Sequence, residues 1–196
     1  MALGKQAKVL TKQQQDTVLS YLSTTRHGLR NKVIFLLSAR AGLRATEIAH
    51  LTWNMLTDAS GALGNCISLT DSASKGKSGG VVWLNKELKA ALDGYRKSLK
   101  NVSADDRVIR SERANGSMTA QVIVNMFAIW YKKMGFDGCS SHSGRRTFIT
   151  NAARKISSVG GSMRDVQALA RHSSLSMTQK YIESDVLAQQ KVVNLI

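Results

Sequence analysis

The sequence predicts a mixed α+β fold that is mainly helical and contains a small three-stranded antiparallel sheet. The chain has 196 residues, and 43% of them are hydrophobic, which is enough for one domain with a buried core. Apolar residues recur at intervals of three and four along most of the chain, as in amphipathic helices. Between residues 55 and 84 this spacing gives way to short β-prone runs separated by turn-forming residues. We expect a leader or linker at 1–10, the domain at 11–182 and a helical tail at 183–196.

The first quarter of the chain predicts three helices. Thr11 begins a capping-box pattern that starts the first helix. The second carries apolar residues at helical spacing from Leu29 onward and ends before Gly42, a residue typical of helix C-termini. Arg44 opens a short third helix that extends to Ala49.

Three β-prone runs follow, at residues 55–58, 66–70 and 81–84. Turn-forming residues at 58–61 separate the first pair of runs. A stretch rich in Ser, Gly and Lys, at 71–80, separates the second pair. These features predict a small antiparallel sheet whose last hairpin has a basic tip.

Helical spacing resumes after the sheet. Asn85 is a favourable N-cap for the next helix, and Gly135 terminates another that begins near residue 119. Three further helices are expected at 143–156, 162–172 and 174–182.

The charge of the chain is strongly positive. Lys and Arg number 28 against 13 Asp and Glu, which gives a net charge of +15. The excess is concentrated at residues 1–46, with Asp16 as the one acid, and at 145–180, with Asp165 as the one acid. This balance excludes an acidic solvating protein and favours a polyanion partner, with the two basic blocks lining one groove. A solvated basic surface is the alternative.

Several other classes of protein are excluded or disfavoured. Cys66 and Cys139 cannot form a disulfide framework or a four-cysteine zinc site, and the histidines lack the spacing of metal ligands. Residues 76–78 imitate the end of a P-loop, but Asp71 stands where the motif requires its first glycine. The sequence has no membrane span and no signal-peptide pattern. With only two distant cysteines, we expect a reducing, intracellular setting.

Two arginines are candidate phosphate ligands. Arg145 shares a helical stripe with Ile149 near a helix start, and a guanidinium on a core-facing stripe needs an anion. That anion is either a bound phosphate or an internal partner such as Glu47. His142 precedes Arg145 by one helical turn, either as a proton-transfer group or as a capping residue. Arg44 lies three residues before Glu47, so the two can also form a simple surface ion pair.

Four segments together resemble the tyrosine recombinase, or phage integrase, family, and the match runs from about residue 11 to 182. Residues 41–48 (AGLRATEI) are similar to the first arginine box, and 142–148 (HSGRRTF) to the HxxR box. Residues 169–181 (LARHSSLSMTQKY) resemble the segment that carries a second histidine and, nine residues later, the nucleophilic tyrosine. Residues 75–84 resemble the hairpin that carries the family's lysine.

The resemblance implies a site-specific DNA recombinase that cuts and rejoins strands through a 3′-phosphotyrosyl intermediate, without metal or nucleotide cofactor. It implies double-stranded DNA as partner, a homo-oligomer, with four copies on paired DNA sites, and a bacterial or phage-encoded protein of the cytoplasm. Glu47 would orient Arg44 or His142, and Lys77 is an alternative to Lys75. The implied catalytic residues are Arg44, Lys75, His142, Arg145, His172 and Tyr181.

The sequence departs from the family pattern in three respects. Gly144 stands where a bulky apolar residue is usual, and Arg171 where glycine is usual. The family's N-terminal DNA-clamp domain has no counterpart in the chain. The tail at 183–196 packs either on its own domain or on a neighbouring subunit. Two rival functions stay open: topoisomerase IB-like nicking and resealing, and a catalytically silent DNA-binding remnant.

Overall fold

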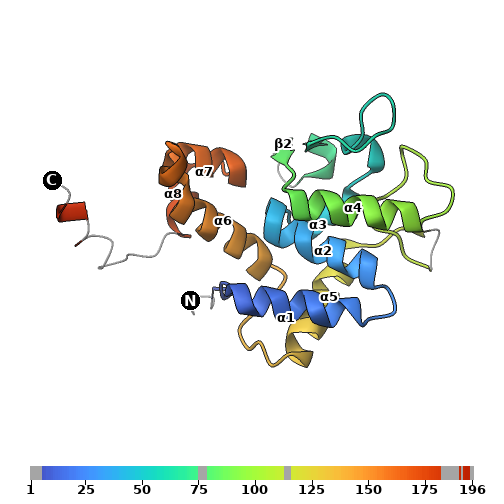
Figure 1. Cartoon of the computed structure of the whole chain (residues 1–196), viewed down its shortest axis with the longest axis horizontal. Coiled ribbons are helices and arrows are strands. Elements are labelled where there is room, and N and C mark those ends of the chain that lie inside the picture. The colour runs from blue at the N-terminus through green and yellow to red at the C-terminus, as the bar shows by residue number, and fades with distance from the viewer. Residues whose placement is uncertain (1–5, 75–78, 113–115, 182–189, 191, 195–196) are drawn as a thin grey trace.

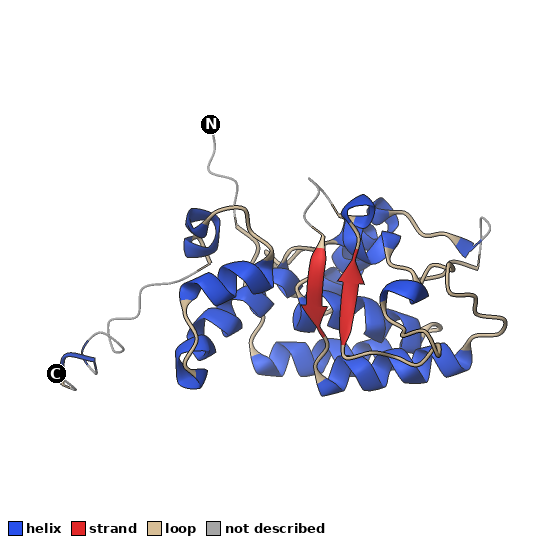
Figure 2. Cartoon of the chain, turned by 90° about the horizontal axis from the view of Figure 1, so that it is seen from above, coloured by secondary structure: helices blue, strands red, loops and turns tan. Residues whose placement is uncertain are grey.

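The computed structural model describes residues 6–74, 79–112, 116–181, 190 and 192–194. Eight α-helices and one two-stranded antiparallel sheet make up the regular structure of these residues (Figures 1 and 2). The helices are α1 (Lys12–Ser23), α2 (Gly28–Ala41), α3 (Ala45–His50), α4 (Lys86–Ser98), α5 (Ala120–Lys133), α6 (Ser143–Lys155), α7 (Met163–Ala170) and α8 (Leu175–Gln179). The strands are β1 (Cys66–Leu69) and β2 (Gly80–Trp83).

The helices form a larger and a smaller cluster (Figure 1). Helices α1–α5 and the sheet enclose the main hydrophobic core, which contains Trp53, Phe35 and Phe127. Helices α6–α8 enclose a small second core around Ile149 and Val166. Helix α6 also packs on α2 and so joins the two clusters. The predicted fold class, mainly helical with a small sheet, is confirmed.

The helix signals in the sequence are also confirmed. Thr11 forms a complete capping box with Gln14, and the side chain of Asn85 accepts a hydrogen bond from the Leu88 backbone N–H. Gly42 ends α2 in the left-handed conformation, with φ of +65°. One detail was wrong: Leu29, expected on the buried face of α2, is 51% exposed.

The predicted third strand is absent from the described residues. Residues 53–55 form a 3₁₀ turn in which the Leu56 and Thr57 backbone N–H groups both bond to the Trp53 carbonyl. The β-prone run therefore satisfies its backbone locally, and a single bridge, between Thr57 and Leu63, is all that it contributes to strand pairing. The remaining pair, β1 and β2, is antiparallel with Cys66 opposite Trp83.

The described ends of the chain behave differently from each other. Leu10 is buried, and its backbone N–H donates to Thr147 Oγ1 of α6 at 2.8 Å, so the end of the predicted leader is packed against the domain. Most of the predicted tail lies outside the described residues. Within it, Val192 and Val193 are exposed.

No helix in the described part of the chain is long and apolar enough to cross a membrane.

Two glycines permit the close contact between α2 and α6. A Cβ atom on Gly144 would lie 2.4 Å from Ser38 Oγ and 2.9 Å from Ser38 Cβ. A Cβ atom on Gly42 would lie 2.5 Å from Cδ1 of Phe148. The departure from the family pattern at Gly144 thus has a structural reason, because a larger residue there would push α6 away from α2.

We expect Gly144→Ala to lower the free energy of unfolding by about 1–3 kcal/mol, because the added methyl group overpacks this contact. Gly94→Ala is the matched control. Gly94 lies within α4 and nothing surrounds its missing Cβ, so the same change should stabilise by about 0.5–1 kcal/mol. Urea denaturation of both variants measures the two signs. Stabilisation by Gly144→Ala would contradict the packing described here.

Candidate active site

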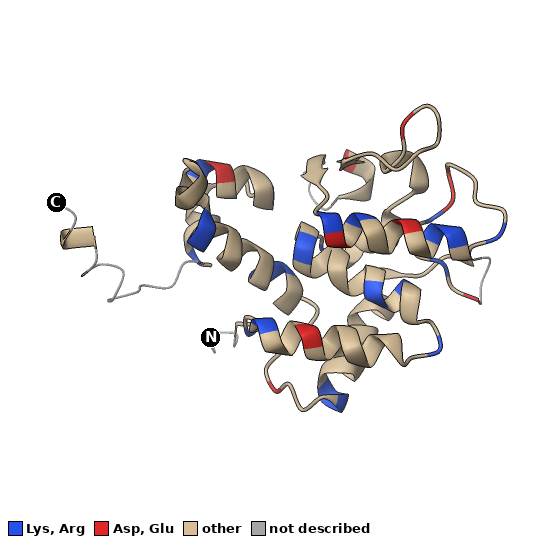
Figure 3. Ribbon diagram, viewed as in Figure 1, with Lys and Arg blue, Asp and Glu red and all other residues tan. Residues whose placement is uncertain are grey.

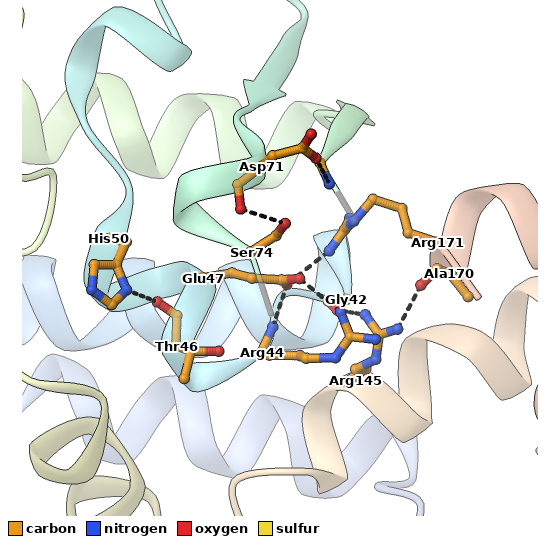
Figure 4. Close-up of polar contacts among 11 residues, drawn as sticks. Gly42, Arg44, Thr46, Glu47, His50, Asp71, Ser74, Arg145, Ala170 and Arg171 are labelled. Carbon is orange, nitrogen blue, oxygen red and sulfur yellow. Dashed lines mark hydrogen bonds and ion pairs between the residues drawn. The ribbon is translucent and has the colours of Figure 1, made fainter. Parts of the chain in front are cut away.

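A buried carboxylate organises the centre of the site. Glu47, on α3, is fully buried, and its Oε1 accepts a hydrogen bond from Arg44 Nη1 at 2.8 Å. Its Oε2 accepts from the Arg44 backbone N–H at 2.8 Å and from Arg171 Nη2 at 2.7 Å (Figure 4). Arg44 and Glu47 therefore do not form a simple surface ion pair. The bond from Arg171 also links Glu47, on α3, to the residue that follows α7.

The charge state of Glu47 follows from these partners. Burial raises the pKa of this carboxyl, but the positive charges of Arg171 and Arg44, with the hydrogen bonds that they donate, outweigh burial and hold the pKa below its ordinary value. Glu47 is therefore ionised at neutral pH and balances one of the positive charges around it.

Arg145 spans the same centre from α6. Its guanidinium is buried and donates to the carbonyl oxygens of Gly42 and Ala170. The alternative from the sequence, an ion pair with Glu47, is not formed, because the Glu47 carboxylate binds Arg44 and Arg171. Burial, followed by repulsion from Arg44, lowers the pKa of Arg145 to about 10, so the group is still charged at neutral pH.

The two basic blocks of the sequence meet here. Arg44 belongs to the N-terminal block, and Arg145 and Arg171 belong to the C-terminal block. Basic residues lie on both helical clusters in Figure 3, and these three arginines lie where the clusters join (Figure 4). One arginine of the first block and two of the second therefore come together, while the expectation that the two blocks line one groove stays a prediction.

His172 and Tyr181 lie together beside the arginines. Their rings stack with centroids 5.3 Å apart, and His172 Nδ1 lies 2.9 Å from the Thr178 hydroxyl. Burial and then the charges of Arg145, Arg44 and Arg171 lower the pKa of His172 to about 4. The imidazole is therefore neutral at pH 7, and it can donate or accept one hydrogen bond without adding to the charge of the site.

Tyr181 follows α8, which is shorter than predicted and ends at Gln179. Its carbonyl accepts a hydrogen bond from the Thr150 hydroxyl, and the guanidinium carbon of Arg146 lies 5.7 Å from the centre of its ring. Tyr181 lines a pocket together with His142 and Arg145. His142 itself is exposed and directly precedes α6.

The candidates for the hairpin lysine, Lys75 and its alternative Lys77, lie outside the described residues. Strands β1 and β2, which flank them in sequence, are where the sequence predicts the hairpin. A Cβ atom on Gly80, at the start of β2, would lie 3.8 Å from Cδ of Arg171, so the base of the hairpin borders the arginine cluster.

The sequence did not predict the place of Arg171 or Arg146 in this site. Arg171 was singled out as a departure from glycine, and its place beside His172 in a basic block was the available signal. Nothing in the sequence indicated that Arg146 would lie over the Tyr181 ring. The described residues contain no group of three or more potential metal ligands.

Comparison with known proteins agrees with the family resemblance found in the sequence. The model of the phage integrase family matches residues 8–187 of this chain. A search of curated proteins found no match.

Several solved structures share the fold. The Tn1549 transposon integrase in complex with a circular intermediate DNA has a TM-score of 0.77 at 17% identity, over 99% of this chain and 67% of that one. XerA recombinase has a TM-score of 0.71 at 22% identity, over 95% and 64%. A lambda integrase dimer bound to a COC′ core site has a TM-score of 0.66 at 18% identity, over 92% and 49%.

We expect Glu47→Gln to lower the free energy of unfolding by about 3–5 kcal/mol at pH 7, because it leaves buried guanidinium groups without their counter-charge. The folded pKa of Glu47 is lowered, so its stabilisation is complete above the unfolded pKa of about 4.3 and is lost as the pH falls through the folded value. Urea denaturation at pH 7 and at several values down to pH 3 measures the difference from the unsubstituted protein, which should be constant above about pH 4.3 and shrink below it. Asp16→Asn, which removes an exposed pair with Lys12, is the control and should cost less than about 1 kcal/mol. An equal cost for the two variants would contradict this account of Glu47.

His172 should remain neutral as the pH is lowered from 7 to 5. NMR of ring-labelled histidine follows the titration, and His172→Gln assigns the signal. The titration midpoint of the buried imidazole beside three guanidinium groups should lie near pH 4. A midpoint near the ordinary value of about 6.5 would show that the ring lies outside this environment.

Proposed function

Since the chain belongs to the phage integrase family, we propose that it is the catalytic domain of a site-specific DNA recombinase in which Tyr181 attacks a DNA phosphodiester. Members of this family are enzymes that cut and rejoin DNA strands. The observation that carries the proposal is the convergence of Arg44, Arg145, His172 and Tyr181, which come from separate segments of the chain, on one basic centre.

Two arginines would bind the phosphate. The guanidinium groups of Arg44 and Arg145 can donate to the non-bridging oxygens as negative charge develops in the transition state. A contact of this kind typically contributes about 2.7–4 kcal/mol. Glu47 is a positioning residue in this proposal, because it holds the Arg44 guanidinium through a bond of 2.8 Å.

The nucleophile requires the loss of its proton. Removing the proton of a phenol with pKa of about 10 costs roughly 4 kcal/mol at pH 7. His142 lines the same pocket as Tyr181 and is the residue proposed to accept that proton. The phenolic oxygen then forms a bond to phosphorus while the bond from phosphorus to the 5′ oxygen breaks, which leaves a 3′-phosphotyrosyl link.

The leaving 5′ oxygen needs a proton donor. Lys75, with Lys77 as the alternative, is proposed for this role from the family resemblance. The 5′ hydroxyl of a partner strand reverses the step, so the energy of the phosphodiester is conserved and no metal or nucleotide cofactor is needed. Neutral His172 would donate a hydrogen bond to the phosphate and hold the Tyr181 ring by stacking.

Double-stranded DNA is the proposed partner. The net charge of +15 and the joined basic blocks support it, and the related Tn1549 and lambda integrases were solved with DNA. Strand exchange between two DNA sites requires several active sites, so we include a homo-oligomer, with four copies on paired sites, in the proposal. A cytoplasmic setting, with chromosomal or mobile-element DNA as substrate, completes it.

We expect the protein to form a covalent adduct with the 3′ end of a cleaved strand when it is mixed with supercoiled plasmid in EDTA and stopped with SDS. Tyr181→Phe should abolish the adduct, because it removes the attacking oxygen. Tyr21→Phe, a change of the same kind at a partly buried tyrosine of α1, should leave the yield unchanged.

The possible results separate the rival functions. An adduct that survives Tyr181→Phe would contradict the choice of nucleophile. DNA binding without any adduct would favour a silent DNA-binding remnant. An adduct that only relaxes the same plasmid, with no exchange between plasmids that carry the native site, would favour topoisomerase-like activity.

A further inference from the structure

Arg171 has an unusual backbone conformation. It ends α7 with φ of +51° and ψ of +48°, and among the described residues Asn101 is the only other non-glycine residue with positive φ. The left-handed conformation is unfavourable for a residue with a Cβ atom such as arginine, whereas glycine adopts it freely. Strained backbone conformations of this kind cluster at functional sites, which makes the Arg171 side chain a candidate for a functional role.

The side chain of Arg171 has unsatisfied donors. It is only 6% exposed, and Nη2 donates to Glu47. Nε and Nη1 are buried and have no hydrogen-bond partner within the described part of the chain. A single hydrogen bond to Glu47 therefore uses one corner of a five-donor guanidinium. Leaving the buried donors of a charged group unpaired costs free energy. An acceptor at the Nε and Nη1 edge of the guanidinium would therefore be stabilising.

The charge around Arg171 indicates what kind of acceptor is missing. The guanidinium groups of Arg44, Arg145 and Arg171 gather around one carboxylate, that of Glu47 (Figure 4). His172 contributes no charge at neutral pH, because its pKa is about 4. Three positive groups and one negative group leave an excess of two positive charges in a buried site, and an anion would reduce that excess.

We propose that Arg171 is a third phosphate-binding arginine of the active site, in which Glu47 holds Nη2 while Nε and Nη1 donate to oxygens of the DNA phosphodiester. The proposal rests on the proposed recombinase function and extends it to a residue that the family pattern assigns to glycine. Arg145 is equally buried and donates to the carbonyl of Ala170, the residue before Arg171. One opening of the site by DNA would therefore expose both guanidinium groups.

Arginine suits this position better than lysine. Its planar fork can bond to a carboxylate along one edge and to phosphate along another, which an ammonium group cannot do with fixed geometry. Lysine at 171 should therefore keep the charge but lose most of the phosphate contact. The Glu47 bond serves to fix the fork, and the free edge serves the substrate.

The test measures the salt dependence of DNA binding. A fluorescein-labelled 30-base-pair duplex of mixed sequence is titrated with the unsubstituted protein and with Arg171→Gln, Arg171→Gly, Arg171→Lys and Arg26→Gln, between 50 and 200 mM NaCl, with circular dichroism to verify folding. Loss of one phosphate contact reduces the slope of log K against log salt by about 0.9. We expect this reduction for Arg171→Gln and Arg171→Gly. Arg26→Gln, which removes an exposed arginine paired with Glu112, is the control for loss of one positive charge and should leave the slope unchanged.

A second measurement, adduct yield on plasmid, should fall at least about tenfold in the Arg171 variants, with partial recovery in Arg171→Lys. Arg171→Gly guards against misfolding, because glycine favours the left-handed conformation. An unchanged slope in folded Arg171→Gly, with Tyr181-dependent adduct retained, would overturn this proposal and leave the recombinase function intact. Equal loss of slope in Arg26→Gln would show that the slope follows net charge and not a contact made by Arg171, which also overturns it. No DNA binding by the unsubstituted protein would overturn both.

Discussion

The carboxylate of Glu47 lies between Arg44, three residues away in sequence, and Arg171, 124 residues away. This pairing of a fully buried acid with two arginines joins the larger helical cluster to the smaller one at the site itself. Arg145 reinforces the joint, because it donates to carbonyl oxygens from both sides, Gly42 and Ala170. The position of His172 and Tyr181 relative to the arginines depends on this joint, since His172 closely follows the end of α7 and its ring stacks on that of Tyr181.

The contact of α2 with α6 sets the geometry that this charge network requires. Gly42 and Gly144 have no side chain at this contact. Phe148 can therefore lie against Gly42, and Ser38 against Gly144. Arg145 is thereby brought within hydrogen-bond distance of Gly42. The two departures from the family pattern, at Gly144 and Arg171, thus lie at the same junction. Gly144 allows α2 and α6 to pack closely, and Arg171 adds a charged group beside Glu47.

The sequence was sufficient for the helices, and it singled out residues that the structure brings together, because both depend on local signals. Capping residues, apolar spacing and the motifs around Arg44, Arg145 and Tyr181 are all readable within about a dozen residues. The third strand was wrong because residues 53–57 satisfy their backbone in a 3₁₀ turn, which local β propensity does not reveal. The pairing of Arg171 with Glu47 was missed, since it joins residues far apart and depends on a left-handed backbone at a non-glycine residue.

Tyr181 is the residue that we propose becomes linked to DNA. Mass spectrometry of the trapped adduct, after nuclease and trypsin digestion, tests this assignment most directly, because cleavage after Lys180 and Lys191 releases a peptide that contains Tyr181 and no other tyrosine. We expect a nucleotide 3′-phosphate attached to Tyr181 in that peptide. A nucleotide on any other peptide would contradict it.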